Sequence, residues 1–298
     1  KGKSAIITGG VRGIGFGIAE EFAKQGADIM ICYRSNEDAA AKAAAELEKY
    51  GTKVIASKGD VADGAYAEQA VKQAVEEEKI DITAFWCGWE GPRTWNFYEG
   101  QETLGLVPAA FRFQRLQMLM EGSDFAKLIG VKNLVTHVGY MPENPYDPNY
   151  QGVIICLKEL AAKCRENGQN FLFETGQETP VTLKRAIQDI GLDNVGVNLD
   201  PANLLMYGKG NPVDALDVFG EYVLGIHGKD GCYPTDGHEL GAEMPLGQGR
   251  VNYPAFIRKL KGIGYEGDIT IEREISGEEQ KKDILMGKKL LEDLIAAE

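Results

Sequence analysis

The sequence has no run of 18 apolar residues, which predicts that this chain forms no transmembrane helix. Basic residues are scarce relative to acidic ones: 32 Lys and Arg face 45 Asp and Glu, and the net charge is −13. A chain with this charge does not favour nucleic acid or an anionic membrane surface as a partner. No signal peptide is expected, because the opening residues lead directly into a predicted strand.

Histidine and cysteine are also rare, with three and five residues. The cysteines show no paired spacing of the kind that binds zinc, and they are Cys32, Cys87, Cys156, Cys164 and Cys232. We expect them to be reduced thiols, which predicts a cytoplasmic protein. The length of 298 residues allows one large α/β domain or two small ones, with a sizeable core either way.

The first part of the sequence alternates short apolar runs with helical segments. Three strands, each followed by a helix, are predicted over residues 4–8, 16–25, 28–33, 38–50, 53–57 and 65–78. This βαβαβα order is typical of a parallel sheet.

A glycine-rich turn follows the first of these strands. Gly9 permits a tight turn, whereas Gly13 and Gly15 allow the backbone to approach a pyrophosphate and the helix to pack on the strand. The phosphates would face the helix N-terminus. Arg34, just after the second strand, lies where an adenosine 2′-phosphate would bind, so it favours NADP over NAD. The alternative interpretation of Arg34 is a solvated loop charge.

The turn Thr8-Gly9-Gly10-Val11-Arg12-Gly13-Ile14-Gly15, with Gly59-Asp60-Val61, resembles the opening of a short-chain dehydrogenase/reductase. The resemblance covers residues 1–81 and implies a Rossmann-like segment. Its candidate cofactor-binding residues are Gly9, Arg12, Gly13, Ile14, Gly15, Arg34, Asp60 and Val61. The resemblance then ends, because residues 85–89 replace the family's Asn-Asn-Ala-Gly turn and no Tyr is followed four positions later by Lys. Without that proton donor, the hydride transfer of this family is not expected.

Four later apolar runs each end in a residue that can bind a metal ion: Glu174, Asp200, His227 and Glu272. Their spacing, about 25 to 45 residues, is what a strand, a loop and a helix use, so they are predicted to end neighbouring strands of one parallel sheet. In a (β/α)₈ barrel the carboxyl ends of all strands meet at one end. Two Glu, one Asp and one His converging there would suit Mn²⁺, Mg²⁺, Co²⁺ or Zn²⁺.

Residues 82–298 resemble the sugar-phosphate isomerase/epimerase family of xylose-isomerase-like TIM barrels. The motifs that carry the resemblance are Phe173-Glu174-Thr175-Gly176-Gln177-Glu178, Asn198-Leu199-Asp200-Pro201-Ala202-Asn203-Leu204, Ile226-His227-Gly228-Lys229-Asp230 and Thr270-Ile271-Glu272-Arg273-Glu274. The resemblance implies that the four strand-end residues coordinate one divalent metal, with Mn²⁺ as the first expectation.

The segment supplies six of the barrel's eight strands, predicted over 82–88, 133–137, 171–174, 195–200, 222–227 and 268–272. The family's first two βα units are missing. The predicted fold is therefore an α/β, (β/α)₈-like TIM barrel whose first units are replaced by a Rossmann-like βαβαβα segment, and the chain is interpreted as a chimera. We expect the leading strands to close the barrel, because six strands alone would leave apolar edges uncovered. The alternative is that they keep Rossmann order and leave it open.

The implied function is a divalent-metal-dependent isomerase or epimerase that acts on a small sugar or sugar derivative through an ene-diolate. Glu174 and Glu272 are the candidate base and acid, each also a metal ligand. His137, Asn203 and Lys229 are candidate substrate-binding residues; packed polar or solvated loop residues are the alternative.

Other interpretations stay open at this point. The chain could be an NADP-dependent oxidoreductase, or an engineered chimera without activity. Metal-dependent DNA repair on the same barrel is disfavoured, because the chain is acidic and has too few histidines for several zinc ions. A homodimer is possible.

Overall fold

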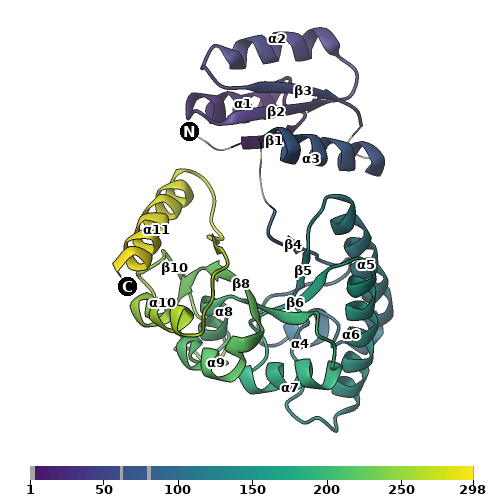
Figure 1. Cartoon of the computed structure of the whole chain (residues 1–298), viewed down its shortest axis with the longest axis vertical. Coiled ribbons are helices and arrows are strands. Elements are labelled where there is room, and N and C mark those ends of the chain that lie inside the picture. Colours follow the sequence, from purple (N-terminus) through teal and green to yellow (C-terminus); the bar gives the residue numbers. More distant parts are fainter. Residues whose placement is uncertain (1–3, 61–62, 79–81, 298) are drawn as a thin grey trace. The chain divides into compact units, whose positions relative to one another are not determined.

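The computed structural model describes residues 4–60, 63–78 and 82–297 (Figure 1). The chain divides into two compact units, Lys1–Ile82 and Thr83–Glu298. Within the described ranges, none of the helices combines the length and the apolar character that crossing a membrane requires.

The first unit is a three-stranded parallel sheet with helices on both faces. The sheet order is β1-β2-β3. Its elements are β1 (Ser4–Thr8), α1 (Gly13–Lys24), β2 (Asp28–Tyr33), α2 (Glu37–Glu48), β3 (Val54–Lys58) and α3 (Gly64–Glu78). These bounds confirm the predicted alternation of strands and helices.

The alternating side chains of β2 build a separate core on each face of this sheet. Ile29 and Ile31 pack with Ala19 and Ala23 of α1 and with Leu47 of α2. The residues between them point to the opposite face, where Met30 and Cys32 pack with Tyr66 and Ala70 of α3. Strand geometry explains this division, because successive side chains point to opposite sides.

The second unit contains a six-stranded sheet in which every neighbouring pair is parallel. Its strands follow the chain order, from β4 at one edge to β11 at the other. They are β4 (Phe85–Trp86), β5 (Asn133–Thr136), β6 (Asn170–Glu174), β7 (Val195–Leu199), β8 (Val223–Gly228) and β11 (Ile269–Ile271). Figure 1 shows the sheet curving with α5, α6 and α7 along its outer side. This is the arrangement of a (β/α)₈ barrel with six of its strands present.

The helices of this unit are α4 (Gly100–Thr103), α5 (Ala109–Leu128), α6 (Pro148–Glu166), α7 (Pro180–Ile190), α8 (Pro201–Met206), α9 (Pro212–Phe219), α10 (Tyr253–Gly262) and α11 (Glu278–Ala297), with a 3₁₀ turn over Gly220–Tyr222. Several begin with a capping side chain followed by proline, a strong start signal. Thr179 caps α7 in this way and Asn211 caps α9.

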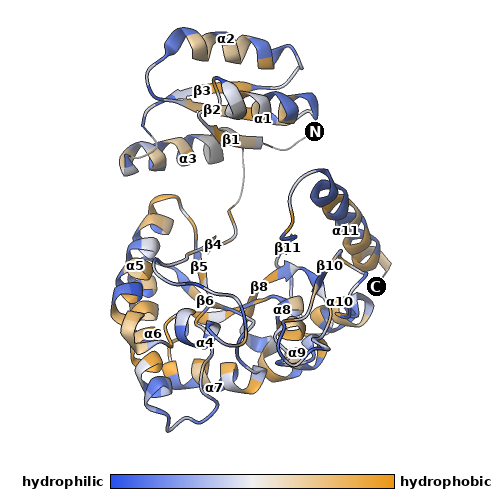
Figure 2. Cartoon of the chain, turned by 180° about the vertical axis from the view of Figure 1, so that it is seen from behind, coloured by the Kyte–Doolittle hydropathy of each residue, from blue (hydrophilic) through white to orange (hydrophobic). Residues whose placement is uncertain are grey.

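In this unit the pattern of buried residues follows from the geometry of its strands and helices. Every residue of β7 is buried, as expected for a strand covered on both sides. On α7 the buried residues include Leu183, Ala186, Ile187 and Ile190, which share one helix face. In Figure 2 the helices α5, α6 and α7 accordingly carry hydrophobic residues beside hydrophilic ones.

The expectation that the leading strands close the barrel is wrong for the part of the chain that the structure describes. There, β1, β2 and β3 pair only with one another, and β4 pairs only with β5. The physical reason is that the first sheet already buries apolar residues on both faces under its own helices.

Three details of the predicted elements also differ. The strand expected over 82–88 is reduced to β4, Phe85–Trp86. Helices α4 and α8 were not among the predicted elements. The long polar loop after β8 contains a small antiparallel pair, β9 (Asp230–Gly231) with β10 (Glu243–Met244).

Candidate metal centre

The four predicted ligands come together at the carboxyl end of the six-stranded sheet. Glu174 is the last residue of β6, Asp200 follows β7, His227 lies in β8 and Glu272 follows β11. One ligand atom from each lies within 4.8 Å of the others, and Glu174 and Asp200 are fully buried.

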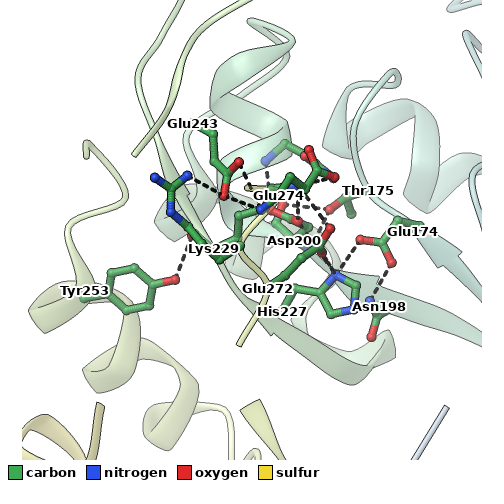
Figure 3. A network of polar contacts seen from close by, with 12 residues as sticks. Glu174, Thr175, Asn198, Asp200, His227, Lys229, Glu243, Tyr253, Glu272 and Glu274 are labelled. Carbon is green, nitrogen blue, oxygen red and sulfur yellow. Dashed lines mark hydrogen bonds and ion pairs between the residues drawn. The ribbon is translucent and has the colours of Figure 1, made fainter. Parts of the chain in front are cut away.

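The imidazole of His227 is the centre of this group (Figure 3). Its Nδ1 lies 2.7 Å from Oε2 of Glu272, 2.9 Å from Oε1 of Glu174 and 3.7 Å from Oδ2 of Asp200. Three carboxylates therefore face one ring nitrogen at the end of the sheet.

The donor set fits a divalent cation. Three carboxylates at this separation repel one another in a buried environment, and a cation between them would remove that cost. Oδ2 of Asp200 is buried and has no hydrogen-bond partner among the described residues. Carboxylate oxygens with one imidazole nitrogen suit Mn²⁺, Mg²⁺, Co²⁺ or Zn²⁺.

The electrostatics of these groups follow from burial and mutual proximity. Burial raises the pKa of Glu174, although His227 acts in the opposite direction. Burial alone would lower the pKa of His227, but Glu174 and the other carboxylates outweigh it and raise this pKa to about 12. A proton on Nδ1 of His227 thus compensates part of the negative charge of the three carboxylates. A bound cation would compensate the same negative charge in place of this proton.

Neighbouring polar groups fix two of the carboxylates. Asn198 donates from Nδ2 to Oε2 of Glu174 at 2.6 Å. Asp200 caps α8, with Oδ1 accepting from the backbone N–H of Asn203 at 2.9 Å. The backbone of Asp200 also exchanges two hydrogen bonds with the hydroxyl of Thr175. Such partners hold ligand oxygens in one orientation before any metal binds.

Lys229 connects the centre to a further carboxylate. Its buried Nζ lies 3.0 Å from Oε1 of Glu274, 3.3 Å from Oε1 of Glu272 and 3.7 Å from Oδ2 of Asp200. These carboxylates keep the pKa of Lys229 above its usual range against the effect of burial. The ammonium is therefore charged and compensates part of the negative charge.

A cavity of about 550 Å³ opens onto the metal-ligand cluster. Its wall combines acidic, aromatic and apolar side chains: Trp86, Trp95, His137, Glu174, Asn203, Met206, Tyr207, His227, Leu240, Thr270, Ile271, Glu272 and Glu274. This volume suits a small molecule.

Two of the three predicted substrate-binding residues line this cavity, and the third does not. His137 and Asn203 are on its wall, whereas Lys229 is buried behind Glu272 and Glu274. Burial lowers the pKa of His137 to about 4, so its ring is neutral at pH 7. Trp95 packs against it with ring centroids 5.0 Å apart.

Three residues at or near the centre were not predicted from the sequence. Asn198 orients Glu174, Glu274 lines the cavity, and Glu178 lies buried nearby with both carboxyl oxygens unpartnered among the described residues. Burial raises the pKa of Glu178 to about 8. The sequence carried a signal for each of them. Asn198 is a polar residue inside an apolar run. Glu178 lies four residues after Glu174, and Glu274 lies two residues after Glu272.

The predicted cofactor-binding residues lie in the other unit. Gly9 and Gly13 adopt positive φ values of 67° and 56°, and α1 begins at Gly13. A Cβ on Gly15 would lie only 2.4 Å from the carbonyl oxygen of Gly9, so glycine is needed for the close approach of helix and strand. Arg12 is the N-cap residue of α1.

Arg34 and Asp60 form an ion pair, with Nη1 and Oδ2 3.6 Å apart and both side chains well exposed. They come from the segments that follow β2 and β3, at the same end of the sheet as the glycine turn. The side chain of Ile14 and all of Val61 lie outside the described part. Nucleotide binding at these residues stays a prediction.

Comparison with known proteins agrees with this architecture. The family model described as xylose isomerase-like TIM barrel matches residues 42–293. A xylose isomerase domain protein from Planctomyces limnophilus is 28% identical with a TM-score of 0.73, over 98% of this chain and 95% of that one.

Two further solved structures share the fold at lower identity. A D-tagatose 3-epimerase-like protein is 18% identical with a TM-score of 0.62, over 99% of this chain and 97% of that one. A xylose isomerase-like protein from Mycobacterium smegmatis, solved in complex with magnesium, is 19% identical with a TM-score of 0.60, over 88% and 90%.

The curated relatives that the chain matches include oxidoreductases, and the chain spans 29% and 33% of the length of two of them and 69% of an L-rhamnose 1-dehydrogenase from Sphingomonas, which is 30% identical over 176 residues. One of these, the uncharacterized oxidoreductase YhdF of Bacillus subtilis, is 46% identical over 83 residues, 28% of this chain and 29% of that protein. The family model covers most of the chain, and this protein belongs to the xylose isomerase-like TIM barrel family.

Proposed function

We propose that this protein is a divalent-metal-dependent isomerase or epimerase that acts on a small sugar or sugar derivative by proton transfer through an ene-diolate. The observation that carries the proposal is the convergence of Glu174, Asp200, His227 and Glu272 beside a cavity of small-molecule size. The magnesium complex of one family member and the epimerase-like name of another structural neighbour support it.

These four residues would hold the cation. When bound, it would polarise a substrate carbonyl and its neighbouring hydroxyl, which makes the proton next to the carbonyl more acidic. Mn²⁺ is our first expectation, and Mg²⁺, Co²⁺ and Zn²⁺ suit the same donors.

Glu174 and Glu272 would carry the proton. Both contact Nδ1 of His227, both line the cavity, and they come from the ends of different strands. One carboxylate removes the proton next to the carbonyl, and the other returns a proton to complete epimerisation or aldose–ketose isomerisation. Burial raises the pKa of Glu174, which makes its carboxylate a stronger base than a solvated one.

The direct test is exchange of the proton next to the carbonyl in D₂O, followed by NMR across a panel of ketoses and aldoses. Glu174→Gln should abolish exchange, whereas Glu166→Gln, which removes an exposed carboxylate on α6, should not. Metal content is measured in each sample, so that loss of the ion is not mistaken for loss of the base. Unaltered proton exchange in the metal-loaded Glu174→Gln protein would contradict the assignment of Glu174 as the base.

A second candidate function is NADP-dependent oxidation or reduction, favoured by the glycine turn and by the similarity to oxidoreductases. The missing Tyr-x-x-x-Lys pair argues against turnover. A titration followed by NADPH fluorescence, combined with a reductase screen, separates the two. Tight binding with turnover would favour this candidate over the isomerase.

The proposed partner is a small sugar molecule. Neither a nucleic acid nor a membrane is proposed as a partner. The cytoplasmic location, the homodimer and the chimeric origin stay predictions.

A further inference from the structure

The cavity beside Glu174, Asp200, His227 and Glu272 carries a further acidic side chain on its wall. Glu274 adds a carboxylate to its wall, and its side chain is more than half exposed. No Lys or Arg is among the described residues that line this cavity. The ring of His137, which also lines it, is neutral at pH 7.

Two basic residues close to Glu272 and Glu274 are already paired with carboxylates. Lys229 is buried behind the wall and lies within ion-pair distance of Glu274, Glu272 and Asp200. Arg273 faces away from the cavity wall toward two other carboxylates, with Nη1 3.0 Å from Oε1 of Glu243 and Nε 2.9 Å from Oδ2 of Asp283. Neither side chain offers an uncommitted positive charge to a ligand.

Glu274 is fixed in this position at two points. Its Oε1 contacts the ammonium of Lys229, and its backbone N–H donates to Glu243 at 3.0 Å. Figure 3 shows Glu274, Glu272 and Asp200 in one network of polar contacts with Lys229. A carboxylate held in this way would accept hydrogen bonds from hydroxyl groups without having to be ordered on binding.

The rest of the wall fits an uncharged polyhydroxylated molecule. Trp86, Trp95 and Leu240 present apolar surface to C–H groups. The buried Nδ1 of His137 has no hydrogen-bond partner among the described residues. By contrast, Glu174, Glu272 and Glu274 line the cavity without a Lys or Arg among its described lining residues, so an added anion would be repelled.

We propose that Glu274, held by Lys229, is a specificity-determining residue that makes this site accept uncharged polyhydroxylated substrates and reject those with a phosphate or carboxylate group. The inference rests on the proposed function for the identity of the site, but it concerns binding and not proton transfer.

The test measures binding to the Mn²⁺-loaded full chain by quenching of tryptophan fluorescence and by calorimetry. The probes are matched pairs, D-fructose with D-fructose 6-phosphate and D-ribulose with D-ribulose 5-phosphate. The neutral member of a pair should bind at least tenfold more tightly. Glu274→Gln should reduce this ratio severalfold, and Glu274→Lys should reverse it. Glu221→Gln, which removes a surface carboxylate paired with Lys184 before β8, should leave the ratio unchanged.

Two results would overturn the inference: tighter binding of the phosphorylated members, or no binding of either neutral sugar. An unchanged ratio in folded, metal-loaded Glu274→Gln and Glu274→Lys proteins would remove the role of Glu274. Selective binding of neutral sugars without proton exchange in any of them would contradict the proposed isomerase function and leave this inference standing.

Discussion

Asn198 donates from Nδ2 to Oε2 of Glu174 at 2.6 Å, and both side chains are buried. The other oxygen of Glu174 faces Nδ1 of His227. One amide therefore fixes the rotation of the carboxylate that we propose as ligand and base.

Asn198→Ala should lower the affinity for Mn²⁺ by about 10- to 100-fold, because Glu174 loses the donor that orients it. Calorimetric titration of the metal-free protein measures this. Asn194→Ala is the matched control: Asn194 is also buried, but its amide bonds the carbonyls of Ala161 and Gln169 away from the centre. It should lower stability without changing metal affinity, and equal affinities in the two variants would contradict the assigned role.

Gly225→Ala should weaken the same centre without touching a ligand. A Cβ at Gly225 would lie 2.2 Å from Oδ1 of Asn198, so the amide must move and release Glu174. Metal affinity should fall to a similar degree as in Asn198→Ala. Gly237→Ala has open space around the new methyl group and should bind metal normally. Asn198→Ala and Gly225→Ala combined should lower metal affinity little more than either change alone, because both remove the same interaction with Glu174.

Asp230→Asn should destabilise the second unit by about 3 kcal/mol. The Asp230 carboxylate accepts from four backbone N–H groups, those of Gly231, Val251, Gly247 and Gly249, at 2.8 to 3.1 Å. An amide replaces one acceptor with a donor and leaves buried N–H groups without partners. Chemical denaturation measures the change, with the exposed Asp236→Asn as control. A loss no larger than that of the control would show that the loop does not depend on this carboxylate.

Glu178→Gln should change how stability depends on pH. The pKa of this carboxyl rises from 4.5 to about 8 because it is buried. Between these values the unfolded chain has released the proton that the folded chain keeps, so wild-type stability falls as pH rises from about 4.5 to about 8. Glu178→Gln has no carboxyl group at this position, so its stability does not fall with pH for this reason.

The gain in stability of Glu178→Gln over wild type should therefore be larger at pH 8 than at pH 5, and on the order of 4 kcal/mol at most. Urea unfolding at both pH values tests it, with Glu159→Gln on the exposed face of α6 as control. A pH-independent difference between wild type and Glu178→Gln would contradict the buried, protonated state.

Gly15→Ala and Gly17→Ala should have opposite effects on the first unit, although both lie in α1. The first places a Cβ 2.4 Å from the Gly9 carbonyl oxygen and should cost about 1 to 3 kcal/mol. The second meets nothing within 4 Å and should stabilise the helix by about 0.5 to 1 kcal/mol. Hydrogen exchange of α1 peptides reports each change, and equal signs would contradict the close helix–strand packing.

Much of the centre was predictable because each ligand follows a short apolar run. A polar residue after a short apolar run is a common sign of a strand end, so Glu174, Asp200 and Glu272 could be placed at strand ends before the structure was known. Helix α8 was missed although Asp200-Pro201 is a cap followed by proline, because the same aspartate was interpreted only as a ligand.

The sequence by itself determined most of the strands and helices, the four candidate metal ligands and the glycine turn, because these depend on residues that are neighbours along the chain. Only the tertiary structure decided that β1 to β3 form a sheet of their own, that Lys229 is buried among carboxylates and that Asn198 holds Glu174. Strand pairing and burial depend on which distant segments compete for the same surface, and local propensity carries no information about that competition.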